Sequence, residues 1–401
     1  MNKSHSKHRS ANVLNAFFLC GALLLSSISL FFSVASAQTR IPHEGNNASA
    51  SNAVERERPQ GLAENTIVRL KHPPERIVAL FPQSLALIAL FGLADKMVGA
   101  PTAKISPSMH EHGFLQSLFP GLMKLSDVGF PGKPNMEMII GLNPDLIILP
   151  YFHQQSDRLF NLLKRPQFRM FGTFSSVDHW LEAVEKFGMA CGKPKIAQAY
   201  ISWFNRISDL VTSRLKSSNE PPAIGNKVLR VVKSGKRYLV YGNRLALGNE
   251  ILRTCGLDAL GADANISGDG MFSIEEALQF DPDLIFIDGT AHSTPQAEVE
   301  LTEPFWKQLR AYREKRVYII PVDDASCFMT GWYFNLSAPL GLLWTAKIAY
   351  PKLFEDIDLD KEAATFYKTF FTIDVAEMRK ANANVKIKEP REGPGPGPGH
   401  K

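Results

Sequence analysis

Two histidines stand at nearly equivalent places in segments that are expected to be loops. His153 lies nine residues after Pro144, and His292 lies ten residues after Pro282. Imidazole rings that face each other across a cleft can bind iron, cobalt or nickel within a chelate or in haem. The alternative is that both are ordinary surface-loop histidines, because neither belongs to a motif with the spacing of metal ligands. The sequence leaves both interpretations open.

Aromatic and polar side chains gather in the same expected loops. Together they could line a flat apolar wall suited to a macrocycle or a catechol ring, although core packing is an alternative for Trp332. Arg244 could pair with an anionic ligand, or it could be a solvated loop charge. The candidate cleft residues are Phe81, Gln83, Ser84, Tyr151, Phe152, His153, Arg244, Met271, Phe272, His292, Phe328, Trp332 and Tyr333.

The sequence contains little that would support catalysis. It has no G-x-S-x-G, H-E-x-x-H or G-K-[ST] motif, and no G-x-G-x-x-G follows a predicted strand. Acids and histidines occur, but no pattern pairs a nucleophile with a base. We therefore expect a binding protein with no cofactor of its own rather than an enzyme.

The composition limits the classes of protein to which the chain can belong. Of its 401 residues, 45% are hydrophobic and 21% are charged, which is typical of a water-soluble globular protein and excludes a polytopic membrane protein or a coiled coil. The net charge of +5 is too small to indicate a nucleic-acid-binding protein. The four cysteines form no C-x-x-C pair, so a thiolate zinc site is not expected.

The elements that would position these residues alternate between strands and helices, which predicts an α/β fold with mostly parallel sheets. The run Leu146–Leu149 is continuously apolar, as in a parallel strand that is buried on both faces. A helix is expected over residues 85–91. The predicted strands are residues 76–80, 97–100, 146–149, 228–232, 238–241, 284–287 and 317–320.

One longer segment, from Pro194 to Lys216, has a single apolar stripe with helical periodicity. A helix of about 22 residues would span roughly 33 Å. Its place near the middle of the chain predicts a strut that joins two lobes, with the ligand cleft between them. Such a strut should restrict lobe closure to small motions.

Two segments align without gaps, 138 positions apart. Residues 136–152 are MEMIIGLNPDLIILPYF, and residues 274–290 are IEEALQFDPDLIFIDGT. In each, a short helix ends at Asn/Asp-Pro, and the chain turns into an apolar strand. The repeat predicts two structurally equivalent lobes.

Several stretches in residues 73–375 resemble one known family. They are Pro74–Leu80, Ala89–Gly99, the two repeat segments with Asn135 and Ser273 before them, and Pro339–Trp344 with the following Tyr350-Pro351. They are similar to the helical-backbone class of periplasmic solute-binding proteins, which serve ABC importers of iron–siderophores, haem and cobalamin. The resemblance implies two lobes joined by one long helix, and a monomer that binds a metal complex, which we expect to be a ferric siderophore.

The resemblance also implies a role for two acids. In the family, an exposed glutamate on each lobe meets arginines of the membrane permease, and Glu137 and Glu275 match by position within the repeat. Each is an acid near a predicted helix start, where the helix dipole favours it, so a purely local role is the alternative.

Other functions left open are a binder of haem, cobalamin or a nickel chelate with the same fold, and an exported enzyme that processes a metal or tetrapyrrole.

The N-terminus has the features of an export signal. Lys3, Lys7 and Arg9 precede a long apolar stretch, and Ala35-Ser36-Ala37 suits cleavage after Ala37, with a permanent membrane anchor as the alternative. We therefore expect a periplasmic protein. Removing residues 1–37 lowers the net charge from +5 to +2.

The predicted divisions of the chain are 1–37 signal peptide, 38–72 flexible leader, 73–175 N-terminal lobe, 176–217 linker with the long helix, 218–378 C-terminal lobe and 379–401 disordered tail.

Three cysteines would remain in the exported chain, namely Cys191, Cys255 and Cys327. An odd number leaves at least one thiol unpaired in an oxidising compartment. Buried free cysteines and a single disulfide are both compatible with the sequence.

Overall fold

The structure, a computed structural model, describes residues 70, 72–81, 84–105, 114–150, 166–170, 176–218, 220–234, 237–240, 247–262, 272–288, 304–323 and 331–381. The predicted signal peptide, nearly all of the leader and the tail beyond residue 381 lie outside these ranges. Within the described ranges, no helix is both long and apolar enough to span a bilayer.

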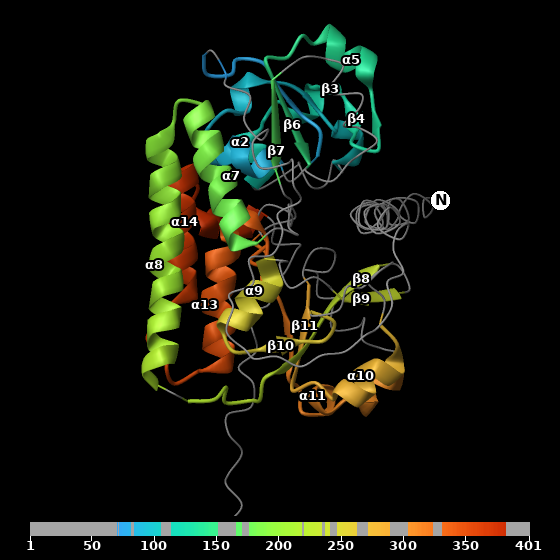
Figure 1. The fold of residues 1–401 in the computed structure, drawn as a ribbon, viewed down its shortest axis with the longest axis vertical. Coiled ribbons are helices and arrows are strands. Elements are labelled where there is room, and N and C mark those ends of the chain that lie inside the picture. The colour runs from blue at the N-terminus through green and yellow to red at the C-terminus, as the bar shows by residue number, and fades with distance from the viewer. Residues whose placement is uncertain are drawn as a thin grey trace, which may run out of the picture.

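The N-terminal lobe is built on a parallel sheet with the strand order β3-β2-β1-β6-β7 (Figure 1). Its strands are β1 (Ile77–Ala79), β2 (Met97–Ala100), β3 (Ser126–Asp127), β6 (Leu146–Pro150) and β7 (Gln167–Met170). A separate antiparallel pair joins β4 (Gly129–Phe130) to β5 (Lys133–Pro134). The helices are α2 (Ser84–Leu90), α4 (Phe114–Leu118) and α5 (Met136–Gly141), with 3-10 turns at Ala94–Lys96, Thr102–Lys104 and Leu122–Lys124.

The C-terminal lobe repeats this plan with the strand order β10-β8-β11-β12. These strands pair in parallel, and β9 adds to β8 in the antiparallel sense. The strands are β8 (Lys227–Ser234), β9 (Arg237–Val240), β10 (Asp258–Ala259), β11 (Leu284–Ile287) and β12 (Val317–Ile319). The helices are α9 (Leu247–Thr254), α10 (Ile274–Phe280) and α11 (Arg310–Arg313), with 3-10 turns at Pro304–Gln308 and Asn335–Ser337.

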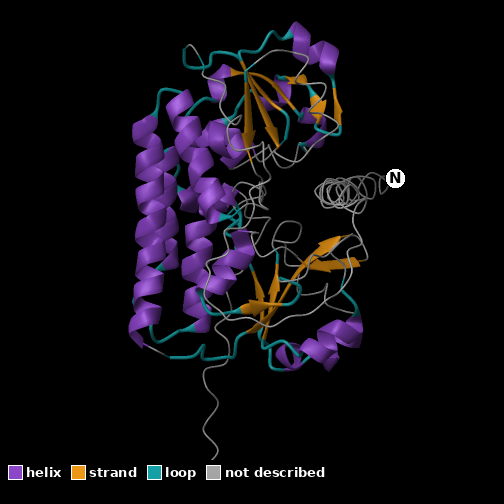
Figure 2. Ribbon diagram, viewed as in Figure 1, coloured by secondary structure: helices purple, strands orange, loops and turns teal. Residues whose placement is uncertain are grey.

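A layer of helices runs along one side of both lobes (Figure 2). It contains α7 (Val177–Ala190), α8 (Pro194–Ser218), α13 (Ala338–Ala349) and α14 (Leu359–Phe371), followed by α15 (Val375–Ala381). The 25 residues of α8 correspond to about 38 Å and confirm the predicted long helix. The α15 helix ends at Ala381, so its last three residues fall within the range 379–401 that was expected to be a tail.

Side-chain contacts fasten α8 to the C-terminal helices. The rings of Trp203 on α8 and Phe366 on α14 stack with centroids 4.6 Å apart. Near the other end of α8, Arg214 donates two hydrogen bonds, of 2.5 and 2.7 Å, to the carboxylate of Asp356. A planar two-point contact of this kind fixes orientation as well as distance. The small range of lobe motion expected from such a strut stays a prediction.

The strands are apolar on both faces because each sheet lies between two cores. In β6, Leu146 and Ile148 face the main core under the helical layer, whereas Ile147 and Leu149 face a second cluster that includes Ile139 of α5. In β11, Leu284 and Phe286 alternate with Ile285 and Ile287 in the same way. Side chains alternate along a strand, so a continuous apolar run is what a sheet covered on both sides requires.

Candidate ligand cleft and docking surfaces

The two repeat segments fold into the same local structure. Asn135 caps α5 by accepting a 3.1 Å bond from the N–H of Met138, and Ser273 caps α10 by accepting a 3.0 Å bond from the N–H of Glu276. Each helix is followed by a residue in the left-handed region, Asn143 and Asp281. Asn and Asp tolerate this conformation better than other residues with a Cβ atom, which accounts for their place before the proline.

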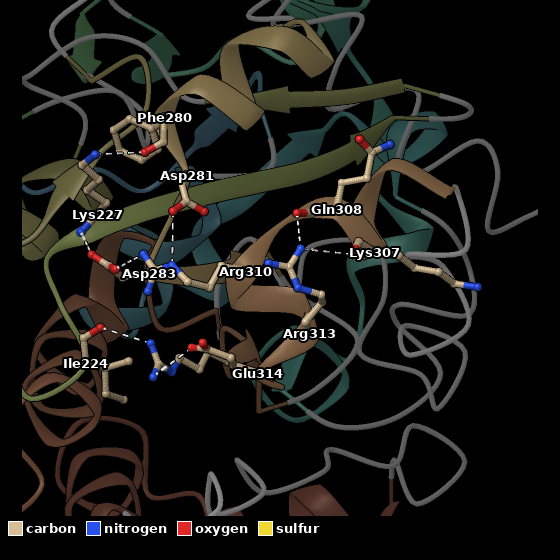
Figure 3. Close-up of polar contacts among 11 residues, drawn as sticks. Ile224, Lys227, Phe280, Asp281, Asp283, Lys307, Gln308, Arg310, Arg313 and Glu314 are labelled. Carbon is tan, nitrogen blue, oxygen red and sulfur yellow. Dashed lines mark hydrogen bonds and ion pairs between the residues drawn. The ribbon is translucent and has the colours of Figure 1, made fainter. Parts of the chain in front are cut away.

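The second acid of each repeat ties the turn to the preceding strand. The carboxylate of Asp145 accepts bonds of 2.8 and 2.9 Å from the N–H groups of Glu75 and Arg76, at the start of β1. In the C-terminal lobe, Asp283 accepts a 3.0 Å bond from the N–H of Lys227, the first residue of β8 (Figure 3). The predicted repeat is therefore confirmed at the level of single hydrogen bonds.

Basic side chains secure both repeat turns. Arg76 donates a 2.7 Å bond to the carbonyl of Leu142, and Lys227 donates a 3.1 Å bond to the carbonyl of Phe280, the residue at the equivalent repeat position. A cation at the C-terminal end of a helix satisfies carbonyls that have no partner within the helix.

In the C-terminal lobe, Arg310 reaches two acids of the turn (Figure 3). It contacts Asp281 at 3.2 Å and Asp283 at 2.6 Å. Burial pushes the pKa of Asp283 upward, but the N–H of Lys227 and the guanidinium of Arg310 outweigh this effect, and the pKa lies below its ordinary value. Asp283 is therefore held in its charged form, in which it can accept these bonds.

Glu137 and Glu275 lie in the first turns of α5 and α10 and are exposed to solvent. Both helices are on the side of the molecule away from α8 (Figure 1). Among the described residues, neither carboxylate has a hydrogen-bond or ion-pair partner. That the two acids together form a docking surface stays a prediction.

The neighbouring acid Glu276 has a different role. Its carboxylate accepts a 2.6 Å bond from the N–H of Ser273 and completes a capping box at the start of α10. Two adjacent glutamates are thus distinguished by their bonding. Glu276 stabilises the helix, whereas the carboxylate of Glu275 has no hydrogen-bond or ion-pair partner among the described residues.

The candidate cleft residues Phe81 and Ser84 lie at the carboxyl end of β1. Both are buried, and the Ser84 hydroxyl donates a 2.5 Å bond to the carbonyl of Phe81. The hydroxyl is therefore occupied by the backbone at the start of α2. Phe272 is partly buried and packs against the outer core of the C-terminal lobe.

Trp332 and Tyr333 were expected in an aromatic cleft wall, and the structure places both in the main core. The indole N–H of Trp332 donates a 2.7 Å bond to Asp323, and the hydroxyl of Tyr333 lies 2.5 Å from that of Thr345. Core packing, the alternative for Trp332, fits this position. The candidates outside the described residues are Gln83, Tyr151, Phe152, His153, Arg244, Met271, His292 and Phe328.

A buried ion pair joins β8 to the residue that follows β11. Arg230 in β8 donates a 2.8 Å bond to Asp288, the residue that follows β11, and both side chains are buried. The guanidinium also lies over the ring of Tyr333, 4.9 Å from its centroid. Sequence reasoning missed this pair, although an arginine inside the apolar run Val228–Val232 is an unusual signal.

Asp323 is a second buried acid that sequence reasoning missed. Its carboxylate accepts bonds from Trp332, from the hydroxyl of Tyr367 at 2.7 Å and from Arg379 at 2.7 Å. The ring of Tyr367 in turn meets Phe114 of the N-terminal lobe, with centroids 5.8 Å apart. This carboxylate therefore links the segment after β12 to the C-terminal helices and, through Tyr367, to the other lobe.

The described residues include no group of three or more histidines, cysteines or acids that could hold a metal ion. The two cysteines that the structure describes, Cys191 and Cys255, are buried free thiols. His153, His292 and Cys327 lie outside the described ranges, so the predicted histidine pair remains a prediction.

Comparison with known proteins decides the family. A family model described as "Periplasmic binding protein" matches residues 77–323, more than half of the chain. The chain belongs to the periplasmic binding protein family. Members of this family bind small ligands, work with ABC transporter permeases and are not enzymes. The expectation of a binding protein is confirmed, and the alternative of a tetrapyrrole-processing enzyme is discarded.

Several curated relatives of this periplasmic binding protein are named for the ligands they bind. The Bacillus subtilis iron-uptake system-binding protein is 24% identical over 256 residues, which cover 61% of this chain and 77% of the relative. The achromobactin-binding periplasmic protein of Dickeya dadantii is 24% identical over 273 residues, covering 65% and 83%. The molybdate-binding protein MolA of Haemophilus influenzae is 30% identical over 113 residues, only 27% of this chain and 30% of that protein.

Solved structures share the fold. A periplasmic solute-binding protein from Veillonella parvula superposes with a TM-score of 0.62 at 21% identity, covering 79% of this chain and 94% of that chain. The vitamin B12-binding protein BtuF of Vibrio cholerae gives a TM-score of 0.52 at 20% identity, covering 69% and 97%. The predicted two-lobe α/β fold is confirmed by this likeness.

Proposed function

We propose that this protein is the periplasmic substrate-binding component of an ABC transporter that imports an iron chelate, a ferric siderophore. The observation that carries the proposal is that three relatives matched over more than 60% of this chain are named for iron uptake, ferric citrate or achromobactin. The fold supports it because both lobes are built on parallel sheets, and ligands of open α/β sheets bind beyond the carboxyl ends of the strands.

The cleft candidates are proposed contacts for this ligand. Phe272, with Tyr151, Phe152 and Met271, would offer apolar surface to the organic part of the chelate. Arg244 would pair with its negative charge, and His153 and His292 would be ligands of the metal. Alanine at Arg244 should weaken the binding of an anionic chelate and leave a neutral one unaffected, and equal affinity for both would remove Arg244 from the site.

Molybdate is a second candidate ligand, because MolA shares 30% identity over 113 residues and has a similar fold. Haem, cobalamin and a nickel chelate remain further alternatives. Native mass spectrometry and absorption spectra of protein purified from its own periplasm would separate them. A broad charge-transfer band is expected for a ferric siderophore, whereas a Soret band would indicate haem, and a mass increase equal to molybdate would contradict the iron proposal.

The permease contact is proposed to run through Glu137 and Glu275. Both carboxylates are exposed and have no hydrogen-bond or ion-pair partner in the part of the chain that the structure describes, so they would be available to arginines of a permease, one on each lobe. Alanine at both positions should abolish chelate uptake by cells while the affinity for the chelate stays unchanged. Glu276→Gln is the matched control, because it removes a charge from the same turn but keeps the capping oxygen. Full uptake by the double variant would reject this contact.

Export and monomeric state complete the proposal. Cleavage after Ala37 predicts that the protein recovered from the periplasm begins at Gln38. N-terminal sequencing tests this directly, and retention of residues 1–37 on a membrane-bound protein would favour the anchor instead. Sedimentation of the mature protein should give the mass of one chain.

A further inference from the structure

Large apolar side chains are exposed next to both proposed docking acids. Among the described residues, the large hydrophobic side chains with substantial exposure are Met138 (38%), Ile140 (59%), Ile274 (43%) and Met189 (65%). Three of these four belong to α5 and α10, the repeat-related helices that carry Glu137 and Glu275. Only Met189, at the end of α7, lies elsewhere.

Both helices also have buried positions, so these side chains are not exposed merely because the helices lie in solvent. On α5, Ile139 is fully buried against the N-terminal sheet. On α10, Ala277 is fully buried against the C-terminal sheet. Each helix therefore has its inward residue in place and presents further apolar side chains to solvent. Exposed apolar groups beside charged ones are typical of protein interaction surfaces.

The spacing places one apolar side chain on the face of Glu137. Ile140 follows Glu137 by three residues, which puts both on the same face of α5, whereas Met138 is its sequence neighbour and lies further around the helix. Ile274 directly precedes Glu275 at the start of α10. An ion pair that is surrounded by apolar contacts is shielded from water and is stronger than the same pair on an open surface. The apolar neighbours would thus shield the ion pair from water, whereas a glutamate on an open surface has no such shielding.

We propose that Met138 and Ile140 on the N-terminal lobe and Ile274 on the C-terminal lobe form apolar contacts with the permease around the two glutamates. This inference rests on the proposed function. The permease would present a basic side chain flanked by apolar ones at each of two sites, one facing α5 and one facing α10. The α5 site exposes two large apolar groups and the α10 site one, so the α5 site should contribute more of the apolar contact.

A second copy of this chain fits these surfaces less well. In a two-fold symmetric dimer built on these surfaces, the glutamates of one copy, Glu137 and Glu275, would face the glutamates of the other copy. Like charges brought together in an apolar setting repel. A partner with basic groups is complementary, and the permease is the partner that the proposed function supplies.

The test compares three variants of the full-length protein in cells that lack the wild-type gene. They are Met138→Gln with Ile140→Gln, Ile274→Gln, and Met189→Gln as the matched control on an exposed residue away from α5 and α10. The measurements are uptake of radioactive iron supplied as ferric citrate or as a ferric catecholate, affinity of each purified variant for the same chelate, and melting temperature. The uptake of Glu137→Ala with Glu275→Ala is measured in parallel.

We expect uptake to fall about five- to thirtyfold in the α5 double variant and less in Ile274→Gln, with affinity and melting temperature unchanged. Met189→Gln should transport like the wild type. Normal uptake in both apolar variants, with loss in the glutamate double variant, would overturn this inference and leave the proposed function intact. An equal loss of uptake in Met189→Gln would overturn the inference, because the loss would then follow from any polar substitution on the surface. A wild-type dimer that dissociates on Ile140→Gln would also overturn it and would assign the surface to a second copy of the chain. If the wild type neither binds nor transports either chelate, the proposed function and this inference fail together.

Discussion

Asn143 and Asp281 have the same left-handed backbone conformation, with φ angles of 45° and 44°, although they stand 138 positions apart. Each follows the repeat helix of its lobe and precedes the proline that stops the helix from continuing. The following acids, Asp145 and Asp283, then bond to the strand beside them. The two lobes are therefore related by a shared turn, and this turn places α5 and α10, with their exposed glutamates, at corresponding positions.

Two substitutions at Asp281 should separate the effect of its backbone conformation on stability from the effect of its charge. Asp281→Val places a β-branched residue at a positive φ and should destabilise the protein by about 1–2 kcal/mol. Asp281→Asn keeps a residue that tolerates this conformation and loses only a partly exposed ion pair with Arg310, worth about 0–1 kcal/mol. Urea denaturation measures both. If Asp281→Asn is as destabilising as Asp281→Val, the ion pair rather than the backbone determines the choice of residue.

Asp323 should be among the most sensitive positions in the chain. Asp323→Ala removes one of the two acids bonded to Arg379 and the acceptor that the buried groups of Trp332 and Tyr367 share, so a loss of about 2–6 kcal/mol is expected, about 1–3 kcal/mol for each of the two buried donors. Tyr367→Phe removes one bond to a charged acceptor and should cost about 1.5–3 kcal/mol.

Tyr350→Phe is the matched control for Tyr367→Phe. The Tyr350 hydroxyl donates a 3.1 Å bond to a neutral acceptor, the carbonyl of Cys255, so its loss should cost only about 0.5–1.5 kcal/mol. The measurement is the urea midpoint of each variant. A Tyr367→Phe protein as stable as wild type would show that the charged acceptor adds nothing.

Gly248 on α9 touches the buried ion pair of the C-terminal lobe. A Cβ atom at this position would overlap the guanidinium of Arg230, which is held by Asp288 and by the ring of Tyr333. Gly248→Ala should therefore destabilise the protein by about 1–3 kcal/mol, although alanine is the better helix former. Gly141→Ala is the control, because its Cβ would meet nothing within 4 Å. Thermal unfolding that shows the same shift for both variants would contradict the predicted overlap.

The two described thiols should be unreactive in the folded protein. Burial raises the pKa of Cys191 to about 12, with a small opposing effect of Lys193, and burial also raises the pKa of Cys255. The thiolate is the reactive form, so iodoacetamide at pH 8 should label neither residue in the native state and both in urea. Peptide mapping reads out each position separately. Rapid native labelling of either residue would mean that its surroundings open readily.

The strands and the long helix could be predicted because their signals are local. The run Leu146–Leu149 is apolar in every position, and the stripe from Ile196 to Leu215 repeats at helical spacing. Strands such as β3 and β10 contain only two residues, which is too short for any periodicity. The turn from helix to strand was predicted from the Asn/Asp-Pro repeat, whereas the left-handed conformation of Asn143 and Asp281 and the N-caps Asn135 and Ser273 were found only in the structure.

The polar contacts inside the protein could not be predicted in the same way, because they join distant parts of the chain. The carboxylate of Asp323 meets Tyr367 and Arg379, which follow it by 44 and 56 residues. No pattern within a short stretch of sequence predicts such a contact. Trp332 shows the consequence, since an aromatic residue near a predicted loop suits a ligand wall and a core equally well until its hydrogen-bond partner is known.

Isothermal titration calorimetry of the mature protein with ferric citrate, a ferric catecholate chelate, haemin and molybdate, in separate experiments, tests the proposed function. We expect saturable binding of one ferric chelate per chain and weak or no binding of molybdate. Tight binding of molybdate or of haemin, with no heat from either ferric chelate, would contradict it.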